Sequence, residues 1–266
     1  MRALRFELSG ETAFFKKPDV NVHAYFTYSH IHKVALCGLL GAIIGLSGYA
    51  RQHERNRMRS TGSKADGSEI AIFPEFYEVL RDIRISIVPH GDRGYFPKKI
   101  QIFNNTVGYA SQEAGGVLNV REQWLERPHW TVYVADCKGL SDQVFEKLAD
   151  YMLNSKAEFM PYLGKNDHPA TIVKPCLIEL EQLDEAPYYI DSLRAAHIGC
   201  DARGTIKNRG LQSYFQEHMP VGLNADNNGY VTQPLVYTNQ EIDPDTLEEP
   251  DWSRLYADGD QTLYFL

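Results

Sequence analysis

The chain is poor in cysteine, and the few cysteines it has lie far apart. The 266 residues include four, namely Cys37, Cys137, Cys176 and Cys200. No pair has the close spacing from which structural zinc sites are built, so we expect no metal centre and no cofactor. Widely separated thiols of this kind are typical of a reducing compartment, which favours a cytoplasmic protein.

Long apolar runs are also scarce. Residues 1–19 are polar and charged without an apolar centre, so no signal peptide is expected. The only long run is KVALCGLLGAIIGLSGYA at 33–50, whose apolar part of 17 residues is at the short limit for crossing a bilayer. The spacing of Gly41 and Gly45 fits a small-residue motif of membrane helices, but nothing else in the sequence supports a membrane. We therefore predict a buried core helix and no membrane association.

This run holds four of the twenty glycines, at positions 38, 41, 45 and 48. Spacings of three, four and three residues place all of them on one face of a helix. Each glycine costs about 1 kcal/mol relative to alanine in a helix, so helix propensity does not explain them. A face without side chains lets a second backbone, or the phosphates of a ligand, come close. A phosphate-cradling loop would place Lys and then Ser or Thr after the last glycine, where Tyr49 stands instead. The pattern favours a helix packed tightly on a sheet.

Positive charge is in the minority, with 27 Lys and Arg against 35 Asp and Glu and a net charge of −8. Its distribution is uneven, because residues 1–64 carry 10 basic and 4 acidic side chains and residues 65–266 carry 17 and 31. Residues 241–266 hold eight acids and one base, Arg254. A basic first quarter indicates local binding of a polyanion, whereas solvation explains the acidic end.

The basic quarter contains a long connection, residues 11–32, between an expected strand and its helix. Connections of this length often carry function. It is rich in aromatic, histidine and cationic side chains, namely Phe14, Phe15, Lys16, Lys17, His23, Tyr25, Phe26, Tyr28, His30 and His32. Residues 51–59 (RQHERNRMR) add four arginines. If the helix continues, Arg51, Arg55 and Arg59 align on one side of it.

The pattern of strands and helices predicts an α+β fold. Alternating apolar residues predict strands at 3–8, 79–88, 129–135 and 171–180, and helical patterns cover 33–50 and 141–153. Ser141 caps the second helix, and Pro175 in the last strand suggests a bulge or an edge. Apart from an insertion, the order strand, helix, strand, strand, helix, strand is that of the ferredoxin-like or RNA-recognition (RRM-like) fold. In that fold the helices cover one face of the sheet, and the other face is free for single-stranded nucleic acid.

We predict two regions along the chain. The ferredoxin-like domain takes residues 1–185 and includes a protruding β-hairpin insertion at about 96–126, with strand signals at 100–103 and 117–124. Residues 186–266 are short runs broken by Gly, Asn and Pro. This composition predicts a small β-rich appendage with strand-like pieces at 188–193 and 235–238.

Several stretches resemble CRISPR-associated proteins of the RAMP class. The start, FELSG at 6–10 followed by a Phe-Lys-Lys-Pro segment, resembles the beginning of these proteins. Thr27-Tyr28 followed by GLLGAIIGL at 38–46 resembles the first helix of the "Cas five" family, the Cascade subunit that holds the 5′ end of the guide RNA. Further matches are REQWLERPHWTVYV at 121–134, MPYLGKNDHPA at 160–170 and MPVGLN…YVTQPLVYTN at 219–239, the last most like type I-B members. Family members often have prolines before the glycine helix, where this chain has SHIHK at 29–33.

The resemblance implies an RNA-binding subunit of an antiviral ribonucleoprotein complex. It implies capture of the short 5′ repeat-derived handle of the CRISPR guide RNA, and a hairpin that forms a thumb. It also implies contacts with the large subunit and with the first backbone subunit of Cascade. Target DNA would be met through the assembled complex, where base pairing reads the sequence.

Holding a single-stranded handle requires cations for the phosphates and aromatic rings for the bases. Cations of the connection and of residues 51–59 could supply the charge, and Tyr25, Tyr28 or Phe15 of the connection could supply the stacking. Core packing is an equally good reading of these aromatics, and a solvated helix end or a protein contact is an equally good reading of the arginines. The candidate RNA-binding residues are Lys16, Lys17, Tyr25, Tyr28, Gly41, Gly45, Arg51, Arg55, Lys98, Lys99 and Arg121.

Catalysis is the rival hypothesis. Relatives in type I-C cut the precursor guide RNA, and metal-independent cleavage needs a base for a 2′-hydroxyl and a cation for the phosphorane. His23, Tyr28, His30, His32 and Lys33 make such an endoribonuclease conceivable. Type I-B systems leave cutting to a separate endonuclease, so we expect binding without catalysis. His30 and His32 could also share a metal ion, but no third ligand follows at a suitable spacing.

Overall fold

The computed structural model describes residues 1–19, 23–60, 70–105, 118–201 and 211–266. It is a mixed α/β structure with several antiparallel sheets. The central sheet has the strand order β3-β6-β1-β7, and each neighbouring pair is antiparallel. Its strands are β1 (Arg2–Ser9), β3 (Ile85–Pro89), β6 (His129–Ala135) and β7 (Thr171–Glu179). Alternation along β1 sends Leu4, Phe6 and Leu8 to one face, where they are fully buried.

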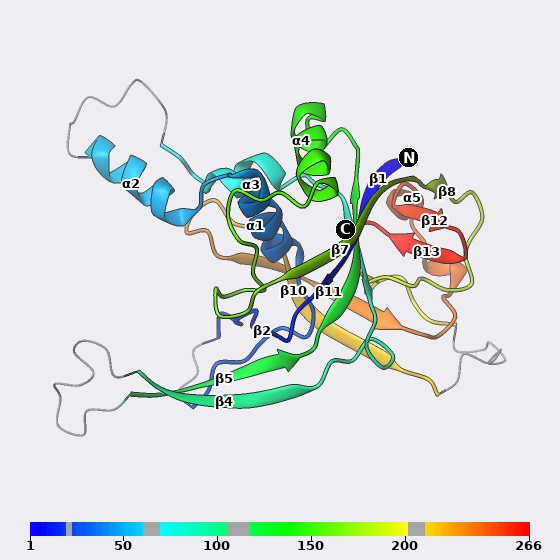
Figure 1. Ribbon diagram of the computed structural model, residues 1–266. Coiled ribbons are helices and arrows are strands. Elements are labelled where there is room, and N and C mark those ends of the chain that lie inside the picture. Colours follow the sequence, from blue (N-terminus) through cyan, green and yellow to red (C-terminus); the bar gives the residue numbers. More distant parts are fainter. Residues whose placement is uncertain (20–22, 61–69, 106–117, 202–210) are drawn as a thin grey trace.

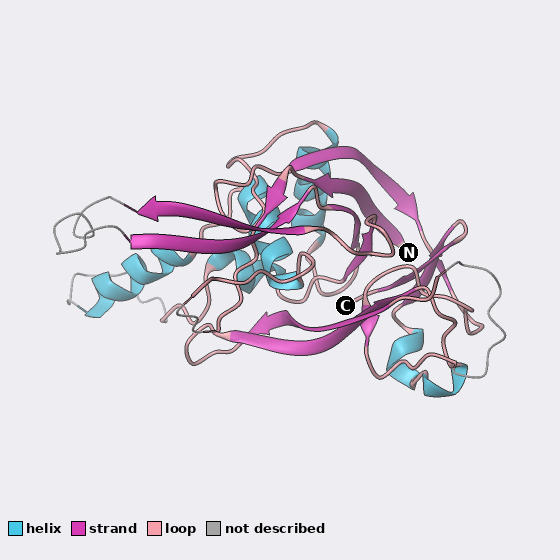
Figure 2. Ribbon diagram, turned by 90° about the horizontal axis from the view of Figure 1, so that it is seen from below, coloured by secondary structure: helices cyan, strands magenta, loops and turns pink. Residues whose placement is uncertain are grey.

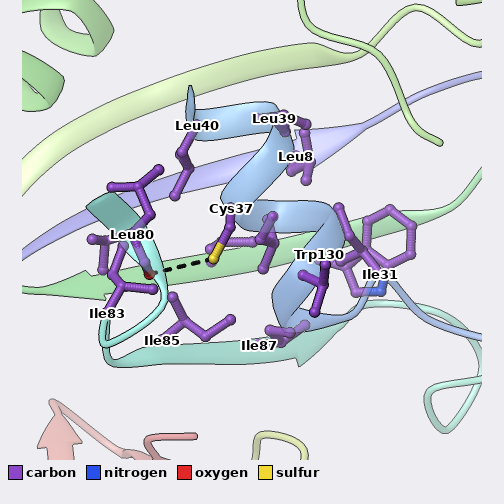
Figure 3. Close-up of a cluster of buried hydrophobic side chains, with 14 of the residues drawn as sticks. Leu8, Ile31, Cys37, Leu39, Leu40, Leu80, Ile83, Ile85, Ile87 and Trp130 are labelled. Carbon is purple, nitrogen blue, oxygen red and sulfur yellow. Dashed lines mark hydrogen bonds between the residues drawn. The ribbon is translucent and has the colours of Figure 1, made fainter. Parts of the chain in front are cut away.

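Three helices cover this face: α1 (Lys33–Ile44), α3 (Glu75–Leu80) and α4 (Asp142–Leu153). Figure 3 shows Cys37 and Leu40 of α1 packed against isoleucines of β3 and the segment before it. The Cys37 thiol donates to the carbonyl oxygen of Leu80 at 3.4 Å. The predicted cap of α4 is confirmed, because the Ser141 hydroxyl accepts from the backbone N–H of Val144.

The predicted strand at 79–88 is wrong in its first part, because α3 occupies residues 75–80. Pro74 stands before the helix, and Glu75 and Glu78 lie in its first turn, where carboxylates stabilise the positive end of a helix. Phe76, Tyr77 and Leu80 are buried, and β3 begins only at Ile85. The alternating isoleucines mask this short helix in the sequence.

The predicted single helix over 33–50 is also wrong. α1 ends at Ile44, and Gly45 adopts the left-handed conformation with φ 84°, as glycine readily does at a helix end. The backbone N–H of Leu46 donates to the carbonyl oxygen of Gly41 at 2.8 Å, which satisfies an end carbonyl. α2 (Tyr49–Ser60) then starts in a new direction, at 79° to α1. Among the described residues no single helix is long and apolar enough to span a membrane; only α1 and α2 taken together meet that test.

A long antiparallel hairpin leaves the body on the same side as α2 (Figures 1 and 2). It consists of β4 (Lys98–Asn105) and β5 (Leu118–Glu126), and the short β2 (Thr12–Ala13) pairs with β5. These strands lie where the sequence predicts an insertion. Residues 106–117, which include the start of the predicted second strand, lie outside the described residues.

The C-terminal region contains two further three-stranded sheets. β9 (Arg194–Ala195), β10 (Tyr214–Leu223) and β11 (Tyr230–Thr238) form one, and β8 (Glu181–Gln182), β12 (Leu255–Asp258) and β13 (Gln261–Tyr264) form the other. A short 3₁₀ helix (Pro244–Thr246) and α5 (Glu249–Trp252) connect β11 to β12. The predicted strand at 235–238 is confirmed within β11, whereas 188–193 is not a strand.

This region shares its core with the rest of the chain. Met219, Leu223 and Leu235 belong to the same buried cluster as α1 and β1. On the opposite face of the central sheet, Tyr256 and Phe265 join a cluster with residues of β1, β3 and β6. The sheet face that the fold would leave free for nucleic acid is therefore partly covered, because the β12–β13 hairpin packs on it.

The expectation for Pro175 is confirmed. β7 is an edge strand of the central sheet, so the missing N–H of proline interrupts no inner ladder. Its pairing with β1 shifts between Arg5 opposite Cys176 and Glu7 opposite Val173, which is a β-bulge. Lys174 within the bulge has φ 53°.

Candidate nucleic-acid interface

A groove of about 1040 Å³ lies where α1 meets α2 and faces the N-terminal connection. The loop 159–165, β5 and the start of β11 complete its walls. Most of its surface is apolar, with many aromatic rings and three cations. Its lining residues are Phe14, Phe15, Lys16, Tyr25, His32, Val34, Ala35, Gly38, Leu39, Ala42, Leu46, Ser47, Gly48, Tyr49, Ala50, Arg51, Phe76, Glu122, Phe159, Tyr162, Gly164, Lys165 and Tyr230.

The N-terminal connection reaches the groove as a short two-stranded ribbon. The backbone N–H of Lys17 donates to Phe26 at 2.8 Å and that of Tyr28 donates to Phe15 at 2.9 Å, so Lys16 pairs with Thr27. Side chains alternate along such a ribbon. Phe15 is buried and Lys16 is exposed at the groove.

Tyr25 is held beside β5 by two backbone hydrogen bonds. Its N–H donates to the carbonyl oxygen of Arg121, and its carbonyl oxygen accepts from the N–H of Gln123, both at 2.8 Å. Tyr25 is 37% exposed, and the Lys16 ammonium lies 4.0 Å from the centre of its ring. An exposed tyrosine with a cation over its face can exchange that cation for a nucleobase.

Small residues make the helix side of the groove smooth. Gly38, Ala35 and Ala42 of α1 line it, and Gly48 follows at the break before α2. Arg51 on the first turn of α2 closes this side, with its side chain 68% exposed and 3.6 Å from Glu54. The glycine-rich run therefore meets the cationic connection at one groove, which Gly38 and Gly48 line in place of the candidates Gly41 and Gly45.

Gly41 and Gly45 do not line the groove. Gly41 is buried, and a Cβ there would lie 2.6 Å from the Cβ of Phe76, so its role is close packing of α1 on α3. Gly45 forms the left-handed end of α1 next to Glu158. Both glycines serve the fold, because helix contact and helix termination each require a residue without a side chain.

Three further candidates are engaged within the protein. Tyr28 is 3% exposed, and burial raises the pKa of its hydroxyl to about 12, so its ring is not available for stacking. The Lys17 ammonium lies 2.5 Å from Glu217. The Lys98 ammonium donates to the Ser29 hydroxyl at 2.8 Å, and burial lowers the pKa of this lysine.

The remaining candidates do not line the groove. Arg55 is exposed on α2 beyond Arg51, and Arg121 is exposed on the hairpin. The Lys99 ammonium lies 3.5 Å from Glu126 and 5.9 Å from the centre of the Trp124 ring. The groove therefore unites Lys16, Tyr25 and Arg51 out of the eleven candidates.

The sequence did not identify several groove residues. Tyr49, Phe159, Tyr162 and Tyr230 add rings to its walls, and Glu122 and Lys165 form an ion pair there. Lys165 lies in MPYLGKNDHPA, a stretch that contributes to the family resemblance, but no local pattern joins it to Lys16. These residues meet only because distant segments fold together.

Two of the three candidate histidines, His30 and His32, are poorly placed for acid–base chemistry, whereas His23 is exposed. His30 and His32 are buried, and burial lowers the pKa of each to about 3. The Nδ1 atom of His32 accepts from the backbone N–H of Ala35 and so caps α1, while the Nδ1 atom of His30 accepts from the indole N–H of Trp130. Within the described part of the chain, no three side chains are grouped as metal ligands.

No protein-family model and no curated protein sequence matches the chain. Solved structures similar to it include a "CRISPR RNA-guided surveillance complex", at TM-score 0.45 and 12% identity over 92% of each chain. A "CRISPR protein from Archaeoglobus fulgidus" is similar at TM-score 0.42 and 9% identity, over 99% of this chain and 98% of that one. A chain of the "Type III-B Cmr-beta bound to cognate target RNA and AMPPnP" is similar at TM-score 0.40 and 8% identity, over 98% of each. These solved structures are of a CRISPR complex, a CRISPR protein and a Cmr complex.

Proposed function

We propose that this chain is the subunit of a type I-B-like Cascade complex that binds the 5′ handle of the guide RNA. The observation that carries the proposal is the groove at the junction of α1 and α2, where exposed aromatic rings and cations converge. The family resemblance of the sequence supports the same reading. In the complex the chain would cap the guide and bridge the backbone and large subunits, and it would meet target DNA only through the assembly.

The chemistry of the groove suits a single strand. Lys16 and Arg51 can neutralise phosphates, and the exposed rings of Tyr25 and Tyr49 can stack on bases. Stacking on an aromatic side chain contributes about 1–3 kcal/mol per base and tolerates any sequence. A groove of this composition needs an unpaired strand, since the bases of a duplex have no exposed faces.

The architecture supports the proposal. The strand order β3-β6-β1-β7, with α1 before β3 and α4 before β7, agrees with the ferredoxin-like arrangement of a RAMP domain. The β4–β5 hairpin occupies the place of the proposed thumb and points in the same direction as α2 (Figure 1). Its outer residues Ile100 and Ile102 are about half exposed, which suits a contact with a neighbouring subunit.

We propose that the protein binds RNA without cleaving it. Metal-independent cleavage would need an accessible base near the bound strand. His30 and His32 are buried and carry lowered pKa values, and burial lowers the pKa of Lys33 as well. These side chains serve the core and the start of α1, and the exposed His23 does not line the groove.

Adjacent lysines allow a matched test of the groove. We expect Lys16→Gln to weaken binding of a single-stranded RNA about tenfold at low salt, because it removes one phosphate partner from the groove. The slope of log Kd against log salt should fall by about 0.7, the value for one phosphate of a single strand. Lys17→Gln removes the same charge from a residue held by Glu217 and should leave both quantities nearly unchanged. Fluorescence anisotropy with labelled repeat-derived RNA measures them.

Two results would contradict the proposal. Equal losses in the two variants would show that overall charge, and not the groove, governs binding. A single defined cut in labelled repeat RNA in the presence of EDTA would make the protein an endoribonuclease. Reconstitution of the complex with its guide adds a direct check, because the 5′ handle should crosslink to this chain.

A further inference from the structure

The groove is lined by an ion pair between a buried carboxylate and a partly exposed lysine, and the binding of phosphates and the stacking of bases leave this pair unused. The Lys165 ammonium lies 3.1 Å from both carboxylate oxygens of Glu122. The indole N–H of Trp124 donates to the same carboxylate at 2.8 Å. Glu122 is only 5% exposed, yet it lines the groove. A carboxylate in an otherwise apolar and cationic groove is unfavourable for phosphate, so its presence requires another explanation.

Glu122 stands directly beside the exposed ring of Tyr25. The two residues form a parallel β-bridge, with the backbone of Tyr25 bonded to the residues on either side of Glu122. Bridged residues send their side chains to the same side of a sheet. A base stacked on Tyr25 would therefore present its edge to the carboxylate of Glu122 and to the ammonium of Lys165.

Resting on the proposed function, we propose that Glu122 and Lys165 read the Watson–Crick edge of one guanine in the bound strand. The edge of guanine offers an acceptor, O6, next to two donors, N1–H and N2–H. A lysine ammonium donates only and a carboxylate accepts only, so the pair matches this row of groups. Lys165 would turn one of its hydrogen bonds from Glu122 to O6, which frees a carboxylate lone pair for the second guanine donor.

The other three bases fit this pair less well. Uracil has one donor between two acceptors, and the outer acceptor would face a carboxylate oxygen. Adenine and cytosine each have an exocyclic amine next to an acceptor, so the carboxylate would gain one hydrogen bond instead of two. Unpaired bases of single-stranded RNA are commonly recognised by such contacts to their edges. The rings of the groove then supply affinity, and the ion pair supplies selectivity.

The test uses the full-length chain and uridine octamers that carry a single guanosine, adenosine or cytidine at each position in turn. Anisotropy titrations give the Kd of each RNA. At one position, the octamer that carries guanosine should have a Kd about tenfold lower than the octamers that carry any of the other three bases there. This ratio is in the range for a good two-bond contact. Glu122→Gln, which keeps an oxygen for Trp124, should reduce this ratio to below about threefold. Glu217→Gln is the matched control on the Lys17 pair and should keep the preference.

The outcomes separate this inference from the proposed function. Tight binding with equal affinity for all four bases at every position would overturn the guanine site and leave the RNA groove standing. A guanine preference that persists in Glu122→Gln would also overturn it. If no octamer binds and Lys16→Gln has no effect, both the groove and the guanine site are wrong. Thermal unfolding of each variant shows whether a lost preference reflects a lost fold.

Discussion

Gly38 and Gly41 are both interior glycines of α1, but they differ in how closely Phe76 of α3 packs against them. This difference gives a sharp test of the packing of α1 on α3. A Cβ added at Gly38 would have Phe76 Cε2 as its nearest neighbour, at an ordinary 3.9 Å. A Cβ added at Gly41 would lie 2.6 Å from the Cβ of Phe76. Because that atom is fixed to the backbone, no rotation of the phenylalanine side chain can relieve the clash, and α3 would have to move.

The magnitudes follow from these contacts. Gly38→Ala should stabilise the protein by up to about 1 kcal/mol, the helix propensity difference. Gly41→Ala gains the same amount from propensity and loses about 1–3 kcal/mol from overpacking. The difference in unfolding free energy between the two variants should therefore be about 1–3 kcal/mol, with Gly41→Ala the less stable. For a chain of this size that corresponds to roughly 2–4 °C in Tm per kcal/mol.

Thermal and urea unfolding followed by circular dichroism measure both variants against the parent protein. Equal urea m-values would show that the extent of unfolding is unchanged. If Gly41→Ala is as stable as Gly38→Ala, α1 and α3 do not pack at the distance described here. The reasoning about the glycine face would then fail.

The remaining predictions concern the end of α1 and the buried histidines. Gly45→Ala should lower the unfolding free energy by about 1–2 kcal/mol, because Gly45 has φ 84° and alanine is strained there; an unchanged urea midpoint would contradict the left-handed end. Acid should destabilise the protein between about pH 6.5 and pH 3, because burial lowers the pKa of His30 and of His32 to about 3, while the unfolded chain takes up these protons near pH 6.5. His30→Gln keeps an acceptor for Trp130 and should reduce the slope of unfolding free energy against pH by at most about 1.4 kcal/mol per pH unit. Urea unfolding at several pH values measures this slope. An unchanged slope would mean that His30 is not buried as a neutral group.

Local patterns predicted most of the central sheet and its helices. The strands at β1 and β6, the capped helix after Ser141 and the edge position of Pro175 all follow from residues close together in the chain. The same holds for the cationic, aromatic connection, since its composition is visible in one stretch. Local patterns failed at α3 and at the break of α1, where a short helix and a left-handed glycine depend on what packs against them.

The sequence by itself determined which segments form strands and helices and that the cations gather in the first quarter, because periodicity and composition are local properties. Only the tertiary structure decided which of these cations face the groove. Lys16 and Lys17 are neighbours, yet only Lys17 meets Glu217, which is two hundred residues away in the chain. Glu122 and Lys165 are likewise brought together by folding. Charge pairing acts through space over a few ångströms, so no pattern along the chain can assign the partners.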